Sequence, residues 1–277
     1  MKKIAALLTV HNRKNKTLKC LSELFVQKGM WKDYQLDVFL TDDGCTDGTA
    51  EAVIAKFPTV HIIKGNGQLF WNRGMYKAWI EAAKVGYDFY LWLNDDTFLY
   101  PDCIVRLLSA SSKHSDRAII VGSTCATSDK THVTYGGWQN GKILSDVSIE
   151  QRSDAINGNI VLIPNSVYYV LGTNDPYYRH AVGDTDYGLR AKEKNVPCYT
   201  GVGIFGECDL HETPTVWMNP SIPFFKRWKN FMSPLGNNPF EYFYFKRKHF
   251  GLLSACFTFL TMWVHFLFPQ FWRKCYK

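Results

Sequence analysis

The sequence lacks the cysteine spacings that hold zinc or build a disulfide framework. None of its eight cysteines forms a CxxC pair, and Cys20, Cys45, Cys103 and Cys125 lie in helix, loop and strand contexts. This distribution favours reduced thiols in a cytoplasm. A P-loop string and a Ser/His/Asp order are also absent from the sequence. The chain is therefore not expected to be a zinc protein, a disulfide scaffold or a P-loop enzyme.

Two further patterns are incomplete. The apolar run 4–10 is too short for a signal peptide, has no small-residue cleavage site after it, and is expected to be a first buried strand. The glycines of 201–206 fit the spacing GxGxxG. They lie late in the chain, with no helix pattern behind them, so a dinucleotide-binding fold is not expected.

The first half of the 277 residues alternates strand and helix patterns. Strands are expected at 4–10, 36–40, 60–63 and 89–93, and helices at 15–28, 46–57 and 71–85. Thr46 is expected to cap the second helix. This order predicts an α/β fold with a parallel sheet and right-handed crossovers.

Each expected strand of the first half ends in polar residues. They are His11-Asn12-Arg13, Asp42-Asp43-Gly44, Gly65-Asn66-Gly67 and Asn94-Asp95-Asp96. In an open parallel sheet these strand ends share one edge, where ligands bind. Four polar ends on one edge predict a site of nucleotide size.

Asn94-Asp95-Asp96 directly follows the apolar run 89–93. Adjacent carboxylates repel each other and are costly to desolvate, so a buried strand is not expected to end in them without a cation nearby. Such oxygen ligands suit Mg²⁺ or Mn²⁺, which keep open positions for substrate phosphates. The alternative is that the pair caps a helix starting near Pro101 or forms a solvated turn.

The second half is less regular. Strands are expected at 118–124, at 131–138 around the turn Gly136-Gly137, and at 159–163, with helices at 165–171 and 184–194. We expect one domain over 1–215 and a helical, basic and aromatic extension over 216–277.

The extension contains a nearly continuous apolar stretch, 250–268, flanked by Lys246-Arg247-Lys248-His249 and Arg273-Lys274. Its length approaches the ~20 residues that span a bilayer. Basic residues on both sides, and His265 within, favour an interfacial or re-entrant helix over a span. The alternative is a packed core or oligomer helix.

The net charge of +7 is concentrated in the same extension. A basic, aromatic segment favours an anionic membrane surface or a nucleic acid as partner. Nucleic acid is not expected, because no recognition motif accompanies the charge.

Three strings in order carry a resemblance to a known family. Thr9-Val10-His11-Asn12-Arg13, then 42–49 (DDGCTDGT), then Asn94-Asp95-Asp96 resemble family-2 inverting glycosyltransferases of the GT-A fold. The likeness covers residues 4–212, and among members it is similar to bacterial rhamnosyltransferases that build surface polysaccharides. It implies a Rossmann-like, mostly parallel central sheet with helices on both faces.

The resemblance also implies residues of the nucleotide pocket. Thr9, Asn12 and Arg13 would line it, and Asn72, at a helix start where anions are favoured, would lie at the donor. Asp42 would accept a hydrogen bond from a uracil or thymine N3–H. The alternative for Asp42 is an Asx turn with Asp43-Gly44, and we favour Asp42 as ligand with Asp43-Gly44 as the turn.

Asn94-Asp95-Asp96 corresponds to the family's DxD-type metal motif, with Asn94 in place of the first acid. Asp96 would bind Mg²⁺ or Mn²⁺ directly, and Asp95 would contact the ribose or a metal-bound water. His211 resembles the late histidine that completes the metal and diphosphate site.

The segment 180–190 resembles the family's ED-x-D-L-x-x-R motif, with Gly183 where Glu is common. Asp184 aligns with the base that deprotonates the acceptor hydroxyl. Asp186 is the second candidate, and Asp184 could alternatively be a helix cap.

These implications predict an inverting, metal-dependent transferase at the cytoplasmic face of the inner membrane. It would move sugar from dTDP-rhamnose or a UDP-sugar to a growing, lipid-linked surface glycan. The alternatives are a sugar-phosphate nucleotidyltransferase, or an inactive nucleotide-sugar-binding protein at the membrane. A homo-oligomer is compatible with the sequence.

Overall fold

The computed structural model describes residues 1–210 and 216–272. Within them a mixed sheet of ten strands has the main order β10-β13-β6-β12-β4-β1-β2-β3, with β5 on β13 and β7 on β6. The four strands of the first half run parallel, as predicted. Their bounds are β1 (Lys2–Val10), β2 (Tyr34–Asp42), β3 (His61–Lys64) and β4 (Phe89–Leu93).

The later strands turn the sheet into a mixed one. β12 runs antiparallel to both β4 and β6, whereas β13 runs parallel to β6. β4 is central, since Leu91 pairs with Ala6 on one side and Leu162 on the other. The bounds are β5 (Phe98–Leu99), β6 (Ile119–Cys125), β7 (Val133–Tyr135), β10 (Gln151–Ser153), β12 (Ile160–Pro164) and β13 (Cys198–Glu207).

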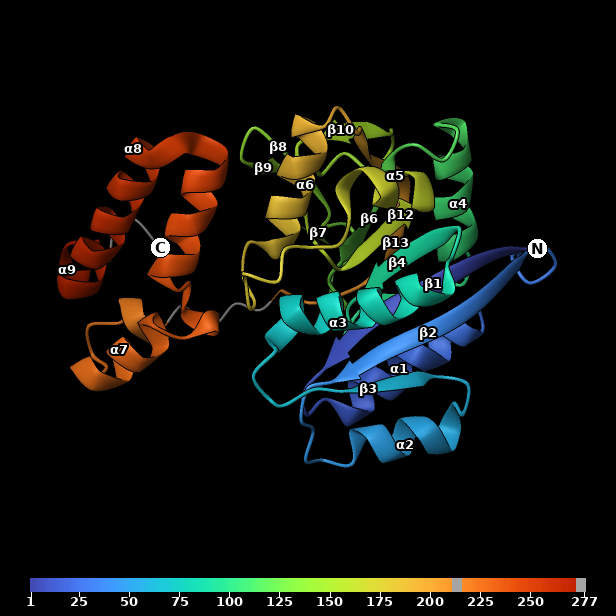
Figure 1. Ribbon diagram of the computed structural model, residues 1–277, viewed down its shortest axis with the longest axis horizontal. Coiled ribbons are helices and arrows are strands. Elements are labelled where there is room, and N and C mark those ends of the chain that lie inside the picture. Colours follow the sequence, from blue (N-terminus) through green and yellow to red (C-terminus); the bar gives the residue numbers. More distant parts are fainter. Residues whose placement is uncertain (211–215, 273–277) are drawn as a thin grey trace. The chain divides into compact units, whose positions relative to one another are not determined.

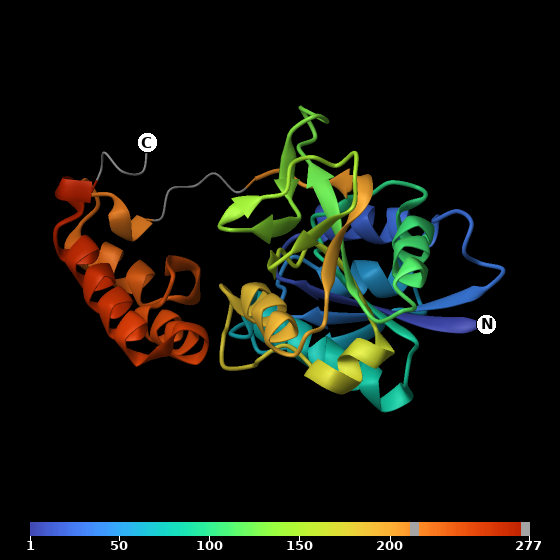
Figure 2. The same cartoon turned by 90° about the horizontal axis from the view of Figure 1, so that it is seen from above.

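Helices cover both faces of this sheet, as Figure 2 shows edge-on. One core lies between the sheet and α1, α2 and α4, and the other lies between the sheet and α3, α5 and α6. The alternating side chains of each buried strand fill the two cores in turn. The helices are α1 (Lys14–Phe25), α2 (Thr49–Lys56), α3 (Phe70–Val85), α4 (Cys103–Lys113), α5 (Asn165–Leu171) and α6 (Gly183–Glu193). The α/β fold with helices on both faces is confirmed (Figure 1).

Two local expectations were wrong. Thr46 does not cap α2, because the chain passes through left-handed Gly48 and α2 begins at Thr49, whose N–H donates to the Asp47 carboxylate at 3.1 Å. The strand expected at 131–138 is two strands that pair with different partners. β7 joins the main sheet, and after Gly136 the chain enters a small sheet of β8 (Gly137–Gln139), β9 (Lys142–Ile143) and β11 (Ala155–Ile156).

The chain divides into two compact units, 1–176 with 184–210, and 177–183 with 211–277. The boundary expected at 215 lies outside the described residues. The sequence did not indicate that the short segment 177–183 joins the second unit. Within that unit, Arg179 pairs with Glu241 through Nε and Oε1 at 2.5 Å.

The second unit has a small aromatic core of its own. Trp217, Phe231 and Phe266 are buried together, with Met262 and Trp263 against them. The elements of the unit are η1 (Val216–Met218), α7 (Phe224–Phe231), η2 (Pro234–Gly236), α8 (Pro239–Leu267) and α9 (Pro269–Trp272).

Candidate functional site

The site is built around the two carboxylates at the end of β4. The N–H of Asn94 donates to the Asn159 carbonyl at 3.1 Å, and the N–H of Thr97 donates to the Asn94 carbonyl at 3.1 Å. This turn directs Asp95 and Asp96 inward, and each residue is only 5% exposed. The carboxylates are therefore neither a helix cap nor a solvated turn.

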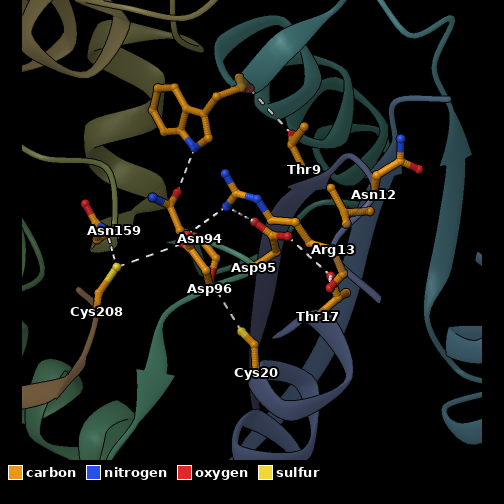
Figure 3. A network of polar contacts seen from close by, with 12 residues as sticks. Thr9, Asn12, Arg13, Thr17, Cys20, Asn94, Asp95, Asp96, Asn159 and Cys208 are labelled. Atoms are coloured by element: carbon orange, nitrogen blue, oxygen red, sulfur yellow. Dashed lines mark hydrogen bonds and ion pairs between the residues drawn. The ribbon is translucent and has the colours of Figure 1, made fainter. Parts of the chain in front are cut away.

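Arg13, three residues after the end of β1, supplies a cation to both carboxylates (Figure 3). Its Nη1 lies 2.7 Å from Asp96 Oδ2 and 3.2 Å from Asp95 Oδ1. The Thr17 hydroxyl, one turn further along α1, donates to Asp95 Oδ2 at 3.2 Å. Two strand ends that are distant in sequence thus meet at one edge of the sheet, as predicted.

Burial makes the charged form of Asp95 unfavourable. The pKa of Asp95 is raised to about 7, chiefly by desolvation and further by the neighbouring Asp96 charge, while the Arg13 charge opposes the rise. The side chain of Arg13, which pairs with both carboxylates, is itself 41% exposed. A cation or a proton is therefore readily accepted here.

The other side of Asp96 faces Cys208, whose Sγ lies 3.9 Å from Asp96 Oδ1. Burial and the charge of Asp96 raise the pKa of Cys208 to about 12, so this residue is a thiol. Asn159 donates to the same sulfur at 3.4 Å. Sequence reasoning missed Thr17, Cys208 and Asn159. The four-residue spacing of Arg13 and Thr17 was a usable signal, whereas Cys208 and Asn159 carry none.

Asn94 also has a structural role of its own. Its Oδ1 accepts a hydrogen bond from the Trp71 indole at 2.7 Å, and the Trp71 ring packs edge-on against Trp92. An amide oxygen accepts this bond without adding a third negative charge beside Asp95 and Asp96. This hydrogen bond gives a physical reason for an asparagine at position 94, where the DxD-type motif has an acid.

Asp43 organises the loop between β3 and α3. Its carboxylate accepts backbone N–H bonds from Gly67, Leu69 and Phe70 at 2.8, 2.9 and 2.9 Å, and the residue is 2% exposed. Asp43 and Gly44 lie within the turn between Asp42 and Cys45, as expected, but the sequence did not indicate that the Asp43 carboxylate also binds this loop. Asp42 Oδ1 accepts the Cys45 N–H at 2.8 Å, which is the Asx turn that we considered less favoured. Asp42 as a base ligand stays a prediction.

Two more residues that were predicted to line the nucleotide pocket make contacts within the protein. Thr9 is 8% exposed, and its methyl would lie only 2.4 Å from a Cβ at Gly74, so it packs β1 closely against α3. Asn12 is exposed and accepts the Thr46 N–H at 2.7 Å. Their donor contacts stay predictions.

Asn72 is fully buried. Its side-chain N–H donates to the Asp175 carbonyl at 2.8 Å, and its Oδ1 accepts from Asn174 at 2.7 Å. Asn72 thus connects α3 to the segment 174–175. The contact of Asn72 with a sugar donor stays a prediction.

The second acidic group begins α6. Asp184 is partly buried and accepts N–H bonds from Gly158 at 3.0 Å and from Thr185 at 2.7 Å. Burial raises its pKa above the ordinary value, and these bonds oppose the rise. A partly exposed carboxylate of raised pKa suits a general base.

Asp186 differs from Asp184 in its surroundings. It is fully buried, and its Oδ2 accepts from Arg190 Nε at 2.9 Å. Arg190 also donates to the carbonyls of Leu171 and Thr173 at 2.8 and 2.7 Å. Asp186 therefore belongs to a structural network, and Asp184 is the better placed of the two to meet a substrate hydroxyl.

One short segment connects the two acidic groups. Gly158 donates its N–H to Asp184, and the carbonyl of the next residue, Asn159, accepts from Asn94. A Cβ at Gly158 would come within 2.3 Å of the Trp71 ring. Asp184 and the carboxylate pair thus flank the start of β12.

The donor set for a metal is partial in the described residues. No group of three or more His, Cys, Asp and Glu ligands occurs in 1–210 and 216–272. His211, predicted to complete the site, lies outside the described residues. Asp95 and Asp96 nevertheless fit Mg²⁺ or Mn²⁺, because they place two buried carboxylates side by side and such hard oxygen ligands suit these cations.

Comparisons with known proteins bear on the family and the fold of this chain. A family model described as glycosyl transferase family 2 matches residues 6–253. No curated protein matches the sequence. Among solved structures, a mannosyltransferase from Pyrobaculum calidifontis, in complex with GDP-Man and Mn²⁺, matches with a TM-score of 0.58 at 11% identity. The match covers 93% of this chain and 74% of that chain, and at this identity it shows a shared fold.

Proposed function

The chain belongs to glycosyltransferase family 2, and from this premise we propose an inverting transfer from a nucleoside-diphosphate sugar to an acceptor hydroxyl. The observation that carries the proposal is the meeting of Arg13, Asp95 and Asp96 at the carboxyl edge of the parallel strands. Asp184 is linked to this group through the segment Gly158-Asn159: Gly158 donates its N–H to Asp184, and the Asn159 carbonyl accepts from Asn94. A site for diphosphate and a base on a neighbouring segment are the two parts that such a transfer needs.

The donor would lie across this edge of the sheet. Asp42 would read the base, and Arg13 would meet the diphosphate, to which a guanidinium donates in bidentate fashion. Asp95 and Asp96 would hold Mg²⁺ or Mn²⁺, which when bound neutralises the charge of the leaving diphosphate. The mannosyltransferase with GDP-Man and Mn²⁺ supports both the donor class and the use of a divalent cation.

Asp184 would act as the base. The acceptor oxygen attacks the anomeric carbon, its proton passes to the Asp184 carboxylate, and the bond from that carbon to the diphosphate oxygen breaks on the opposite side. One carboxylate suffices for this single displacement, because no covalent intermediate forms. The two N–H bonds from Gly158 and Thr185 orient the carboxylate.

We propose dTDP-rhamnose or a UDP-sugar as donor and a lipid-linked surface glycan as acceptor, with transfer at the cytoplasmic face of the inner membrane. The motif strings favour this donor class, and the basic, apolar second unit supports a site next to a membrane.

The test combines donor binding with turnover. The melting temperature of the protein with Mn²⁺ is measured against dTDP-rhamnose, UDP-sugars and GDP-mannose, and transfer from each stabilising donor is then assayed. We expect Asp184→Asn to keep the donor-induced stabilisation and to lose about 10²–10⁴-fold in kcat. Glu193→Gln, at the exposed end of the same helix, is the matched control and keeps wild-type turnover.

Each part of the proposal can fail separately. Wild-type turnover in Asp184→Asn would remove the assigned base. Failure of every nucleoside-diphosphate sugar to stabilise the protein would remove the donor class. Release of pyrophosphate from a nucleoside triphosphate and a sugar phosphate would instead indicate nucleotidyl transfer.

A further inference from the structure

The second half of α8 carries a stripe of exposed apolar side chains. Leu253, Phe257, Leu260, Val264 and Leu267 recur every three or four residues, so they share one helix face. Their exposed fractions are 88%, 71%, 64%, 44% and 51%. So large a run of apolar side chains on one surface marks an interaction site.

The unit's own core uses a different face of this helix segment. Trp263 and Phe266 pack against Phe231 of α7, with ring centroids 5.2 and 4.8 Å apart. Arg227 Nε, also on α7, donates to the Trp217 carbonyl at 2.8 Å and closes this core. Among the described residues, the core of the second unit therefore makes no use of the stripe, which is exposed.

Gly251 divides α8 into two shorter helices. Its φ of 84° and ψ of 169° are not helical, and the chain turns back so that Phe240 and Phe243 contact Phe259 (Figure 1). By length and composition alone, Pro239–Leu267 could cross a membrane. At about 1.5 Å per residue, however, the helix after the break reaches about 24 Å, short of a hydrocarbon core of about 30 Å.

Positive charge lies next to the stripe in the chain. Lys246, Arg247 and Lys248 come just before the break, and Lys226 and Lys229 are exposed on α7. Residues 216–272 contain six Lys and Arg and one acid, Glu241, which is paired with Arg179. An apolar stripe beside basic residues matches the acyl chains and headgroups of an anionic lipid leaflet.

We propose that the second unit is a one-leaflet membrane anchor. The segment 252–267 lies in the plane of an anionic leaflet with its apolar stripe among the acyl chains, and 246–248 contact the lipid phosphates. The chain enters and leaves on the same side. A second copy of the chain fits less well, because a symmetric contact around the stripe would bring two sets of basic residues together. The anchor does not depend on the reaction proposed above.

Vesicle flotation of the full-length chain tests the binding. We expect the protein to bind vesicles of phosphatidylcholine with phosphatidylglycerol. The joint change Lys246→Gln, Arg247→Gln and Lys248→Gln should weaken this binding about 100-fold, because each lost charge lowers the affinity about tenfold or less. The joint change Leu253→Glu and Phe257→Glu lowers binding by more than about 100-fold. Tyr169→Glu, on α5 and at an 80% exposed position, is the matched control and binds like wild type.

Topology is tested on the same vesicles. A cleavable tag after Lys277 is cut by external protease if the chain stays in one leaflet, and is protected if α8 spans. An environment-sensitive fluorophore on exposed Cys256, in a Cys275→Ser background, shifts to the blue when the helix enters the acyl region. Circular dichroism confirms that the Glu variants keep the fold.

Three results would overturn the anchor. They are protection of the tag, undiminished flotation of the Leu253→Glu and Phe257→Glu variant, and a stable dimer that ignores vesicles and dissociates in that variant. Loss of sugar transfer with flotation intact would count against the proposed reaction and leave the anchor standing.

Discussion

Replacing Arg13 with Met removes the counter-cation of the carboxylate pair while keeping the aliphatic stem. Arg13 Nη1 makes a 2.7 Å contact with Asp96 and a 3.2 Å contact with Asp95, both of which are 5% exposed. Breaking a fully buried pair costs about 3–5 kcal/mol, and losing an exposed pair costs about 0–1 kcal/mol. Since the Arg13 side chain is 41% exposed, we expect the metal-free variant to be destabilised by about 2 kcal/mol.

The same change should strengthen the binding of Mn²⁺ in the absence of donor. In the wild type a metal has to compete with the guanidinium for Asp96 Oδ2, and in the variant it does not. If the competition is worth about 2 kcal/mol, the affinity for Mn²⁺ rises about 30-fold. Donor binding falls at the same time, because Arg13 is proposed to meet the diphosphate.

Urea unfolding without metal and titration of free Mn²⁺ by electron paramagnetic resonance measure the two effects separately. Lys32→Met, an exposed cation between α1 and β2, is the matched control and is expected to change neither quantity by more than a few tenths of a kcal/mol. If Arg13→Met left both stability and Mn²⁺ affinity unchanged, Arg13 would not be the counter-cation of the pair.

Three more predictions concern the acidic residues. Asp186→Asn leaves the half-buried Arg190 without its charge partner, so we expect a loss of about 3 kcal/mol in unfolding free energy by denaturant titration, with turnover per folded molecule largely kept. Burial raises the pKa of Asp184, and the base works only when ionised, so kcat/KM should rise with pH through a pKa above the ordinary 3.8. The folded protein binds that proton more readily than the unfolded chain, so the contribution of Asp184 to stability falls as pH rises above 3.8, and Asp184→Asn should flatten both slopes. Asp43→Asn weakens three charge-assisted backbone bonds and should cost about 3 kcal/mol, and unchanged protease resistance of the loop at 65–70 would contradict that role.

Hydrophobic periodicity determined the first half of the fold because β1, β2 and β4 are largely buried and the helices between the strands are strongly patterned. The strand expected at 89–93 is β4, and the four polar strand ends meet at one edge because parallel strands share their direction. The same regularity explains why the pairing of Arg13 with Asp95 and Asp96 lay within reach of the sequence.

The sequence could not predict which of two neighbouring acidic residues in a motif has which role. Asp42 and Asp43 are adjacent and chemically identical, and Asp184 and Asp186 are two residues apart on one helix. Which member is buried depends on the segments that fold over it: Gly67–Phe70 for Asp43, and Arg190 with its carbonyl partners for Asp186. The sequence determined which residue types reach the site, since strand direction and motif spacing are local properties. Only the tertiary structure decided which carboxylates are buried and hydrogen-bonded within the protein, and that the apolar helix breaks at Gly251. Burial and backbone conformation depend on contacts between distant segments.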